Sequence, residues 1–391
     1  MKTLGGAPMT VAAVVVLGAI ASFSLGVEPA IAMQLGLQLR LPPHMTGLLL
    51  SAEVGASMLA SLPGLLWSRR VAPRAVAVIA ALAYVAANLF SSLYPAYVSL
   101  LAWRALAGLA GGTLLIVVLA GAARCANPER VYGAWVIGQT LPATAGLYGL
   151  QRLFATAGLQ AAYLLMALAM ILSLPLVRGL PRHPAPNSRD LATPRGHRLS
   201  QAAAALSVLF LFYASVGGIW AFAADRGAAA GIAAPRVATE LAVASLAGIA
   251  GAALAVWIGQ SRWRTRLLIA GHGTLACALV LFAAGDNEWV FAASAIVLQI
   301  AWSFTAPFLL ALAADTGAPG SMMSSANFIL GAGLTAGPLL TGNMLELPGA
   351  FSLAAAAAGL LLLAGTIVLA WSVRGAPAAP RDGGAQGAPA S

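Results

Sequence analysis

Three ionisable side chains, Glu53, Arg104 and Glu28, stand inside long apolar stretches of the 391-residue sequence. Glu53 lies about 12–14 Å into its stretch at the usual helical rise, and Ser57 and Ser61 follow it at four-residue steps. A buried carboxylate is either neutral or paired, because a bare charge in a low-dielectric medium is prohibitive. A carboxyl group in such a place binds and releases a proton near neutral pH. We therefore expect Glu53 and Arg104 to form a proton-coupling pair.

Each of these residues also has a plainer interpretation. An arginine near the middle of a membrane costs at least ~2.5–3.5 kcal/mol, so Arg104 should face a cavity or a carboxylate. The alternatives are that Arg104 extends to the outer interface, or that the pair is static and only fixes helix packing. Glu28, the alternate coupling carboxylate, lies roughly 30 Å along the first stretch. That depth places it close to the outer interface, where it could simply be an interfacial carboxylate before Pro29.

Polar and aromatic residues in several stretches are suited to line a solute cavity. In the fifth stretch, Thr140, Thr144, Tyr148 and Arg152 fall at four-residue steps on one helical face. Interhelical hydrogen bonds, packing or an aromatic belt would explain the same residue types. The expected cavity residues are Gln139, Thr140, Thr144, Tyr148, Tyr213, Trp220, Gln299, Trp302 and Asn327.

Residue patterns for metal, nucleotide or enzyme chemistry are missing from the sequence. The four histidines are scattered and none is near Cys125 or Cys277, so we expect no metal site. The chain has no G-x-x-x-x-G-K-[ST] phosphate loop, and we expect no cofactor, with a proton gradient as the energy source. Without clustered carboxylates, paired histidines or a Ser/His couple at membrane depth, we expect no enzyme.

The elements that position these residues follow from composition. The chain is 60% hydrophobic and 8% charged, against about 25% charged residues in soluble domains. Because lipid offers backbone groups no partner, apolar stretches of about 20 residues predict helices rather than barrel strands. The twelve stretches are 8–33, 45–67, 75–94, 98–122, 131–154, 160–177, 201–224, 237–259, 267–284, 289–313, 321–345 and 351–373.

Basic residues indicate the orientation and the domain organisation. Sixteen of the 21 Lys and Arg residues fall in one set of loops, which the positive-inside rule places in the cytoplasm with both termini. The same rule, rather than nucleic-acid binding, explains the net charge of +10. The Pro- and Arg-rich segment 179–200 predicts a cytoplasmic linker between six-helix bundles at 1–178 and 201–374. Residues 375–391, rich in Ala, Gly and Pro, are expected to be a disordered cytoplasmic tail.

The two predicted bundles share a weak repeat. Arg70 and Arg74 follow the second stretch, and Arg262 and Arg266 follow the eighth, each pair four residues apart at a cytoplasmic helix end. Duplicated six-helix halves around a central site are a transporter architecture.

Three local motifs bring the chain close to a known family. Gly64 begins the segment GLLWSRRVAPR, which resembles the loop signature G-x-L-x-D-R-x-G-R-R, with Ser and Val in place of its Asp and second Gly. Residues 100–108, LLAWRALAG, match the L-x-x-x-R-x-x-x-G pattern of proton-coupled members. Residues 333–342, GLTAGPLLTG, are similar to the antiporter signature G-x-x-x-G-P-x-x-G-G.

These motifs, with six plus six helices and a basic central linker, resemble the major facilitator superfamily over residues 8–373. The resemblance implies an all-α membrane protein with 12 transmembrane helices in two pseudo-symmetric six-helix bundles. Its gating elements map to Gly64, Arg69, Arg70 and Arg74 in the loop, and to Gly337 and Pro338 in the eleventh stretch.

The function expected from the sequence is proton-coupled secondary transport of a small amphiphilic or aromatic organic solute by alternating access. Arg104 and a cavity with few fixed charges favour export. A proton-symport importer of a metabolite or nutrient and a non-transporting receptor or scaffold are the alternatives. We expect a monomer in a bacterial cytoplasmic (inner) membrane, with the lipid bilayer and a small-molecule substrate as its partners.

Overall fold

The structure is a computed structural model that describes residues 8–61, 71–94, 96–125, 128–182, 197–258, 263–284, 287–314, 319–347 and 349–374. Gly64, Arg69 and Arg70, as well as most of the predicted linker and the whole predicted tail, lie outside these ranges. Within them the ordered structure is entirely helical.

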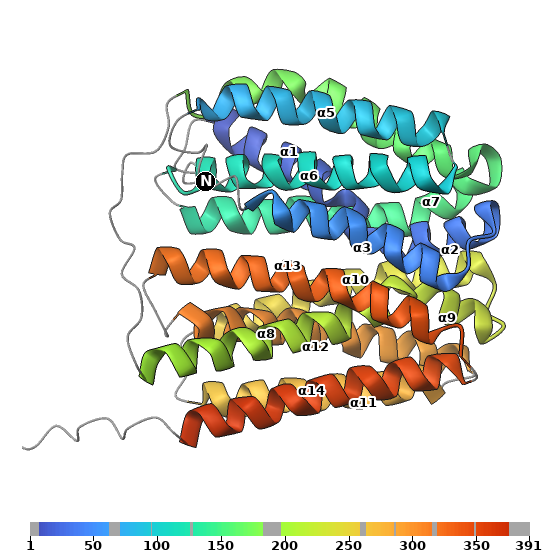
Figure 1. The fold of residues 1–391 in the computed structure, drawn as a ribbon, viewed down its shortest axis with the longest axis vertical. Helices are drawn as coiled ribbons and strands as arrows, with labels where there is room; N and C mark the ends of the chain where they lie inside the picture. Colours follow the sequence, from blue (N-terminus) through green and yellow to red (C-terminus); the bar gives the residue numbers. More distant parts are fainter. Residues whose placement is uncertain are drawn as a thin grey trace, which may run out of the picture.

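The helices lie side by side and run back and forth along one direction (Figure 1). The first half of the chain contains α1 (Pro8–Gly26), α2 (Glu28–Leu39), α3 (Pro43–Leu59), α5 (Pro73–Leu93), α6 (Tyr97–Ala122), α7 (Pro128–Ser173) and the short 3-10 helix η1 (Leu174–Gly179). The second half contains α8 (His197–Ala221), α9 (Ala223–Ala229), α10 (Ala234–Ile258), α11 (Arg264–Ala284), α12 (Glu288–Ala314), α13 (Pro319–Met344) and α14 (Ala350–Arg374).

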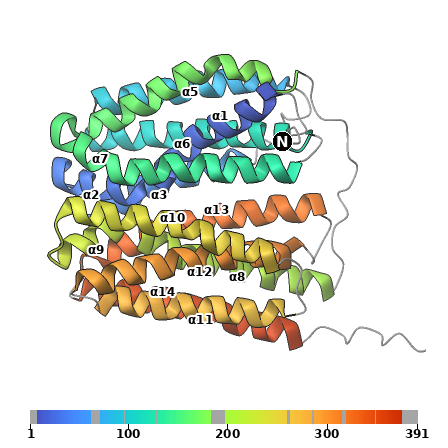
Figure 2. The ribbon, with the colours of Figure 1, turned by 180° about the vertical axis from the view of Figure 1, so that it is seen from behind.

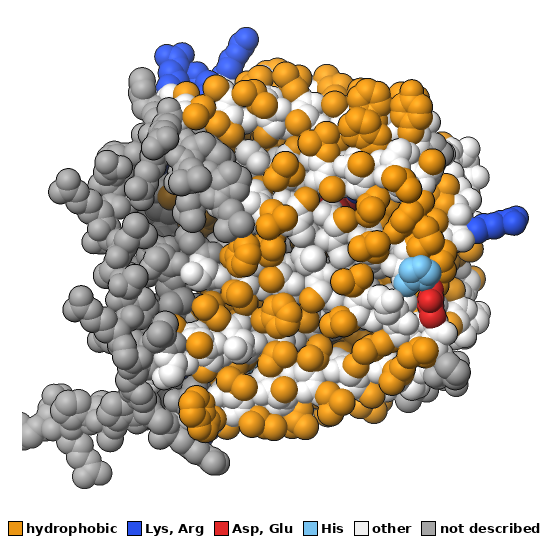
Figure 3. All heavy atoms as spheres, viewed as in Figure 1, with side chains coloured by type: hydrophobic (Ala, Val, Ile, Leu, Met, Phe, Trp, Pro, Cys, Tyr) orange, Lys and Arg blue, Asp and Glu red, His pale blue; other side chains and the backbone are white. Residues whose placement is uncertain are grey.

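The helices make twelve passes. In the described residues, nine helices are long and apolar enough to cross a membrane. One of them, α7, holds two passes, because Gly158 leaves the helical region with φ 67° and ψ −174°. The shorter α3 and the more polar α13 supply the remaining two. Hydrophobic side chains cover much of the visible face between the two ends (Figure 3), as a surface in contact with lipid requires. The predicted fold class is confirmed.

The two halves repeat the same backbone features. The first pass of each half breaks near its end, at Val27 (φ −108°, ψ 16°) and at Phe222 (φ −104°, ψ 19°). The next connection contains a left-handed residue in both halves, Arg40 with φ 52° and Gly231 with φ 75°. These matching backbone positions form a repeat of their own, while Arg70 and Arg262 of the predicted sequence repeat lie outside the described residues.

The first pass is longer than the apolar run predicts. It was expected to end at residue 33, whereas α2 continues to Leu39. Gln34 and Gln38 end the apolar run but not the helix, and Gln38 accepts a hydrogen bond from the Leu159 backbone N–H (2.7 Å). Twelve residues, or about 18 Å of helix, therefore follow the break. Glu28 therefore lies at the start of α2, with the rest of that helix beyond it.

One end of the molecule is closed between the halves, and we call it the Arg40 end after the turn that lies there. The halves meet where α3 packs on α13 and where α7 packs on α10 (Figures 1 and 2). Gly47 of α3 is so near α13 that a Cβ atom there would lie 2.3 Å from the Pro338 carbonyl oxygen. Closer to the Arg40 end, His44 at the start of α3 contacts the carboxylate of Glu346, which follows α13.

Candidate ion-coupling site

An Arg–Glu pair joins α3 to α6 inside the first half. The Arg104 guanidinium donates from Nη2 to Glu53 Oε1 (2.7 Å) and from Nε to Oε2 (3.1 Å). Both carboxylate oxygens are thus engaged by one planar fork, the strongest arrangement for this pair of groups. The Arg104 side chain has no exposed surface, and the Glu53 side chain is 14% exposed.

Two further residues fix the guanidinium. Arg104 Nη1 donates to Asn88 Oδ1 (2.9 Å), and the Asn88 amide is oriented by its own hydrogen bond to the Tyr84 carbonyl (2.9 Å). The ring of Tyr163 lies 4.7 Å from the guanidinium carbon, at cation–π distance. Arg104 is therefore held from three sides, and it does not extend to the interface.

Glycines on α6 explain why the pair can form. Gly108 and Gly112 follow Arg104 at four-residue steps, so all three lie on one face of α6. A Cβ on Gly112 would lie 2.3 Å from the Ser57 carbonyl oxygen, so α6 and α3 touch backbone to backbone. The Arg-x-x-x-Gly spacing noted in the sequence brings the two helices close enough for a short, bidentate contact.

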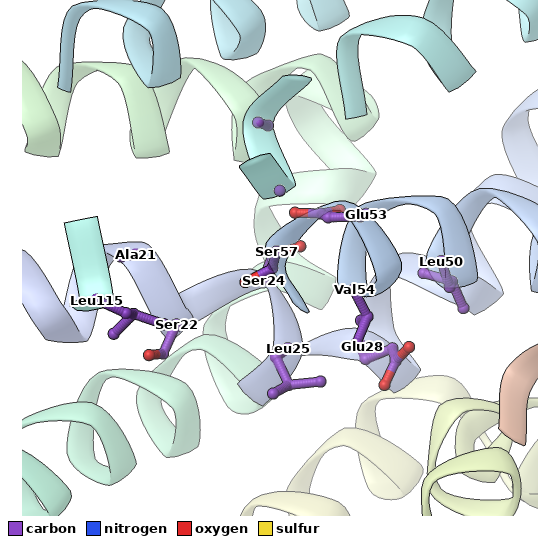
Figure 4. Close-up of a pocket in the computed structure, with 12 residues that line it drawn as sticks. Ala21, Ser22, Ser24, Leu25, Glu28, Leu50, Glu53, Val54, Ser57 and Leu115 are labelled. Carbon is purple, nitrogen blue, oxygen red and sulfur yellow. The ribbon is translucent and has the colours of Figure 1, made fainter. Parts of the chain in front are cut away.

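A small cavity of about 70 Å³ adjoins the pair. It lies between α1, α2, α3 and α6, and Figure 4 shows Glu53 and Glu28 approaching it from different helices. Its polar lining is completed by Ser22, Ser24 and Ser57. A cavity of this size holds a few water molecules, not a whole organic solute.

Glu28 differs from Glu53 in its partners. Glu28 is 3% exposed, and its Oε1 atom is buried without a hydrogen-bond partner. Because Glu53 and Arg104 neutralise each other, an ionised Glu28 would leave the cavity with one uncompensated negative charge. A single proton or monovalent cation would restore neutrality.

The predicted cavity residues on α7 lie outside this pocket. Thr144 donates to Ser245 Oγ of α10 (3.4 Å), which links the halves. Thr140 donates to the Val136 carbonyl of its own helix (2.8 Å). Tyr148 is 44% exposed and receives a hydrogen bond from Arg152. Gln139 is half-buried on the same helix.

In the second half, the predicted residues do not line the cavity beside Glu53. Tyr213 is buried on α8 with its ring 6.3 Å from that of Trp302 on α12, in an edge-to-face arrangement. Trp220 and Gln299 are buried, and Asn327 on α13 is exposed. These positions stay predictions of a solute-contacting surface.

Among the predicted gating residues, Arg74 links the start of α5 to the end of η1 in the first half. Its guanidinium donates to the Leu180 carbonyl (3.2 Å) and contacts the Arg178 carbonyl, so it caps η1 from the start of α5. Gly337 packs on α8, where a Cβ would lie 2.5 Å from the Gly218 nitrogen. The following residue, Pro338, presents its carbonyl to Gly47, as described above.

Asn88 and Tyr163 were not expected from the sequence. Asn88 is a single amide in the apolar stretch 75–94, and this isolation was the signal that could have identified it. Tyr163 carried no such signal, because an aromatic residue in an apolar helix is ordinary. Within the described part of the chain, no cluster of three His, Cys, Asp or Glu side chains could hold a metal ion.

Comparisons with known proteins agree with this architecture. The model of the Major Facilitator Superfamily matches residues 10–319. A mutant of the nucleoside transporter NupG superposes with a TM-score of 0.72 at 12% identity, covering 92% of this chain and 99% of that one. No curated protein sequence matches the chain significantly.

Two further solved structures share the fold. A bacterial homolog of the human lysosomal transporter Spinster, in an inward-facing and unoccupied conformation, has a TM-score of 0.66 at 14% identity, covering 95% of this chain and 96% of that one. The human organic anion transporter MFSD10 (TETRAN) has a TM-score of 0.65 at 16% identity, covering 92% of this chain and 98% of that one.

Proposed function

The chain belongs to the major facilitator superfamily, a family of secondary transporters that work by alternating access, and from that premise we propose that it couples solute movement to a proton gradient. The proton would bind at Glu28, next to the fixed Glu53–Arg104 pair. The solute would be a small amphiphilic or aromatic organic compound, exchanged for the proton and exported.

The unpartnered Glu28 carboxylate carries this proposal. Glu53 is held by two hydrogen bonds from Arg104, so its protonation would break a buried pair and is disfavoured. Glu28 has no such partner on Oε1 and is far cheaper to bury as a neutral acid. This assigns the exchange step to the carboxylate that the sequence marked only as the alternate, with Glu53 and Arg104 as positioning residues.

The same charge balance supports antiport of a cationic solute. An ionised Glu28 attracts either a proton or the cationic group of an organic solute to a cavity lined by three serines and by apolar residues such as Leu25, Leu50 and Val54. Competition for one carboxylate makes binding of the two mutually exclusive, and mutually exclusive binding is what exchange requires. Aromatic residues of the second half, such as Tyr213 and Trp302, would complete the solute site when the halves rearrange.

Orientation follows from the basic residues. The described Arg74, Arg124, Arg178 and Arg266 lie near helix ends opposite Arg40, and we propose that this end faces the cytoplasm of a bacterial cell. The closed Arg40 end would then be the outer face.

Everted membrane vesicles test this proposal. Compounds that become toxic to a deletion strain are added to energised vesicles loaded with acridine orange, which reports the proton gradient. Proton release that depends on the compound and is lost in Glu28→Gln supports antiport. Glu288→Gln, which removes a carboxylate at the Arg40 end of α12, is the matched control and should behave like the parent.

Two other results would decide against the proposal. Accumulation of a compound together with protons would identify the importer alternative. A protein that reaches the membrane folded, yet moves no compound and changes no susceptibility in the deletion strain, would fit a receptor or scaffold.

A further inference from the structure

Asp225 lies two residues beyond the position in the second half that corresponds to Glu28 in the first. Each half begins with a pass that breaks with nearly the same backbone geometry, at Val27 and at Phe222. Each break is followed within three residues by a carboxylate. In both carboxylates one oxygen is buried without a hydrogen-bond partner, Oε1 of Glu28 and Oδ2 of Asp225.

Residues from both halves of the chain surround Asp225. A cavity of about 160 Å³ at the Arg40 end is lined by Phe222 at the break, by Asp225 of α9, by residues 345 and 351 of the second half, and by α2 and α3 of the first half. Thr46 is the other lining residue with a polar side chain. Both views place α2 and α9 at this same end (Figures 1 and 2).

The nearby arginines, Arg226 and Arg236, contact other groups. Arg226 donates from Nε to the Phe282 carbonyl (2.9 Å) and faces the Phe351 ring. Arg236 on α10 binds Glu288 (2.5 Å) and Glu240 (3.3 Å). The other described carboxyl and imidazole groups on α2, on α3 and after α13 are Glu28, Glu53, His44 and Glu346. Glu53 is paired with Arg104, and His44 contacts Glu346.

We propose that Asp225 is a second proton site, one that holds the Arg40 end closed when it is protonated. An ionised Asp225 in this cavity would be a partly buried charge whose Oδ2 atom has no hydrogen-bond partner, whereas the neutral acid is tolerated. Opening this end separates α2 and α3 from α9 and α13, and it brings water to Asp225. Proton binding therefore favours the closed end, and proton loss favours the open one.

This inference rests on alternating access but not on proton exchange at Glu28. Because the closed state binds the proton more tightly, the ratio of open to closed molecules rises with pH. For one titrating group the rise is up to about tenfold per pH unit between its pKa values in the two states. Outside that pH window the ratio of open to closed molecules does not change with pH.

The test is a distance measurement across the closed end, without substrate or proton gradient. Spin labels are placed on cysteines at Leu37 and Leu347, both exposed, in a protein whose Cys125 and Cys277 are serine. The His44→Gln background removes the other cross-half ionic pair that titrates. In the parent, the population with the longer distance should grow with pH.

Asp225→Asn should stay closed across the pH range, and Asp225→Glu should keep the pH response with a shifted midpoint. Glu288→Gln should follow the parent. An unchanged pH response in Asp225→Asn, or the absence of any response in the parent and in Asp225→Glu, would overturn the proposal. A pH response that survives in Glu28→Gln while proton-coupled transport is lost would separate this site from the proposed coupling site.

Discussion

Gly108 of α6 lies directly against the backbone of Glu53 on α3. A Cβ atom at position 108 would lie 1.9 Å from the Glu53 carbonyl oxygen, which is closer than two such atoms can approach. The same contact sets the distance over which Arg104, one turn earlier on α6, reaches the Glu53 carboxylate. Helix packing and the charge pair are therefore one structural unit, and a change to either should affect the other.

Gly108→Ala should destabilise the folded protein. The added methyl group must push α6 from α3, and overpacking of this kind costs roughly 1–3 kcal/mol. Gly149→Ala on α7 is the matched control, because a Cβ there meets nothing within 4 Å. Alanine in an open helical position is neutral to stabilising by up to about 1 kcal/mol. Thermal unfolding in detergent should thus give shifts of opposite sign, and equal shifts would refute the close contact.

Arg104→Gln should be more damaging than loss of a surface charge. It leaves Glu53 as a buried carboxylate without a partner, and breaking one side of a buried pair costs about 3–5 kcal/mol. The double variant Glu53→Gln/Arg104→Gln should regain part of that stability, because no unpaired charge remains. Additive losses in a double-mutant cycle, measured by unfolding in detergent, would contradict the pairing.

Gly47→Ala should open the Arg40 end. The new methyl group would collide with the Pro338 carbonyl oxygen of α13, at 2.3 Å. An overpacking cost borne only by the closed state would raise the open population roughly five- to a hundredfold. Spin-label distances between positions 37 and 347 report this population, with Gly359→Ala on α14 as a control in open space. A closed population equal to that of the parent would exclude Gly47 from the seam.

His44 and Glu346 should contribute a second, opposite pH response. The hydrogen bond from His44 lowers the pKa of the Glu346 carboxyl below its ordinary value of 4.5. A lowered pKa in the closed state means that the stabilisation is present above the ordinary value and is lost as the pH falls through the lowered one. Acid therefore opens this contact, whereas protonation of Asp225 closes its cavity.

The size of that response is small, because both side chains are exposed and salt screens them. Glu346→Gln should raise the open population a few fold at pH 6 and leave it unchanged once the pH is below the lowered pKa of the Glu346 carboxyl, in low salt. An effect of Glu346→Gln that grows on acidification would contradict the assignment. The measurement is made in Asp225→Asn, so that only one of the two responses is present.

The sequence predicted the architecture well because it depends on composition. Long apolar stretches must become helices in lipid, and this single constraint is enough for the twelve passes. The approach of Glu53 and Arg104 was also predictable, since both lie at similar depth and neither can be buried alone.

The length of the first helical pass beyond its break at Val27 could not be predicted from the sequence. The first pass was expected to end at residue 33 because Gln34 and Gln38 interrupt the apolar run, and the continuation of the helix to Leu39 was therefore missed. Hydropathy does not distinguish a polar residue in water from one that is satisfied by a neighbouring turn. The cavity around Asp225 was equally hidden, because it is formed by segments of both halves that are far apart in the sequence.

Infrared spectroscopy of the purified protein tests the central claim most directly. The spectrum of Glu28→Gln is subtracted from that of the parent at a series of pH values, which isolates the carbonyl band of the protonated Glu28 acid. We predict a band that titrates away as the pH rises, and no equivalent band when Glu53→Gln is compared with the parent. A titrating acid band that belongs to Glu53 and not to Glu28 would contradict the account.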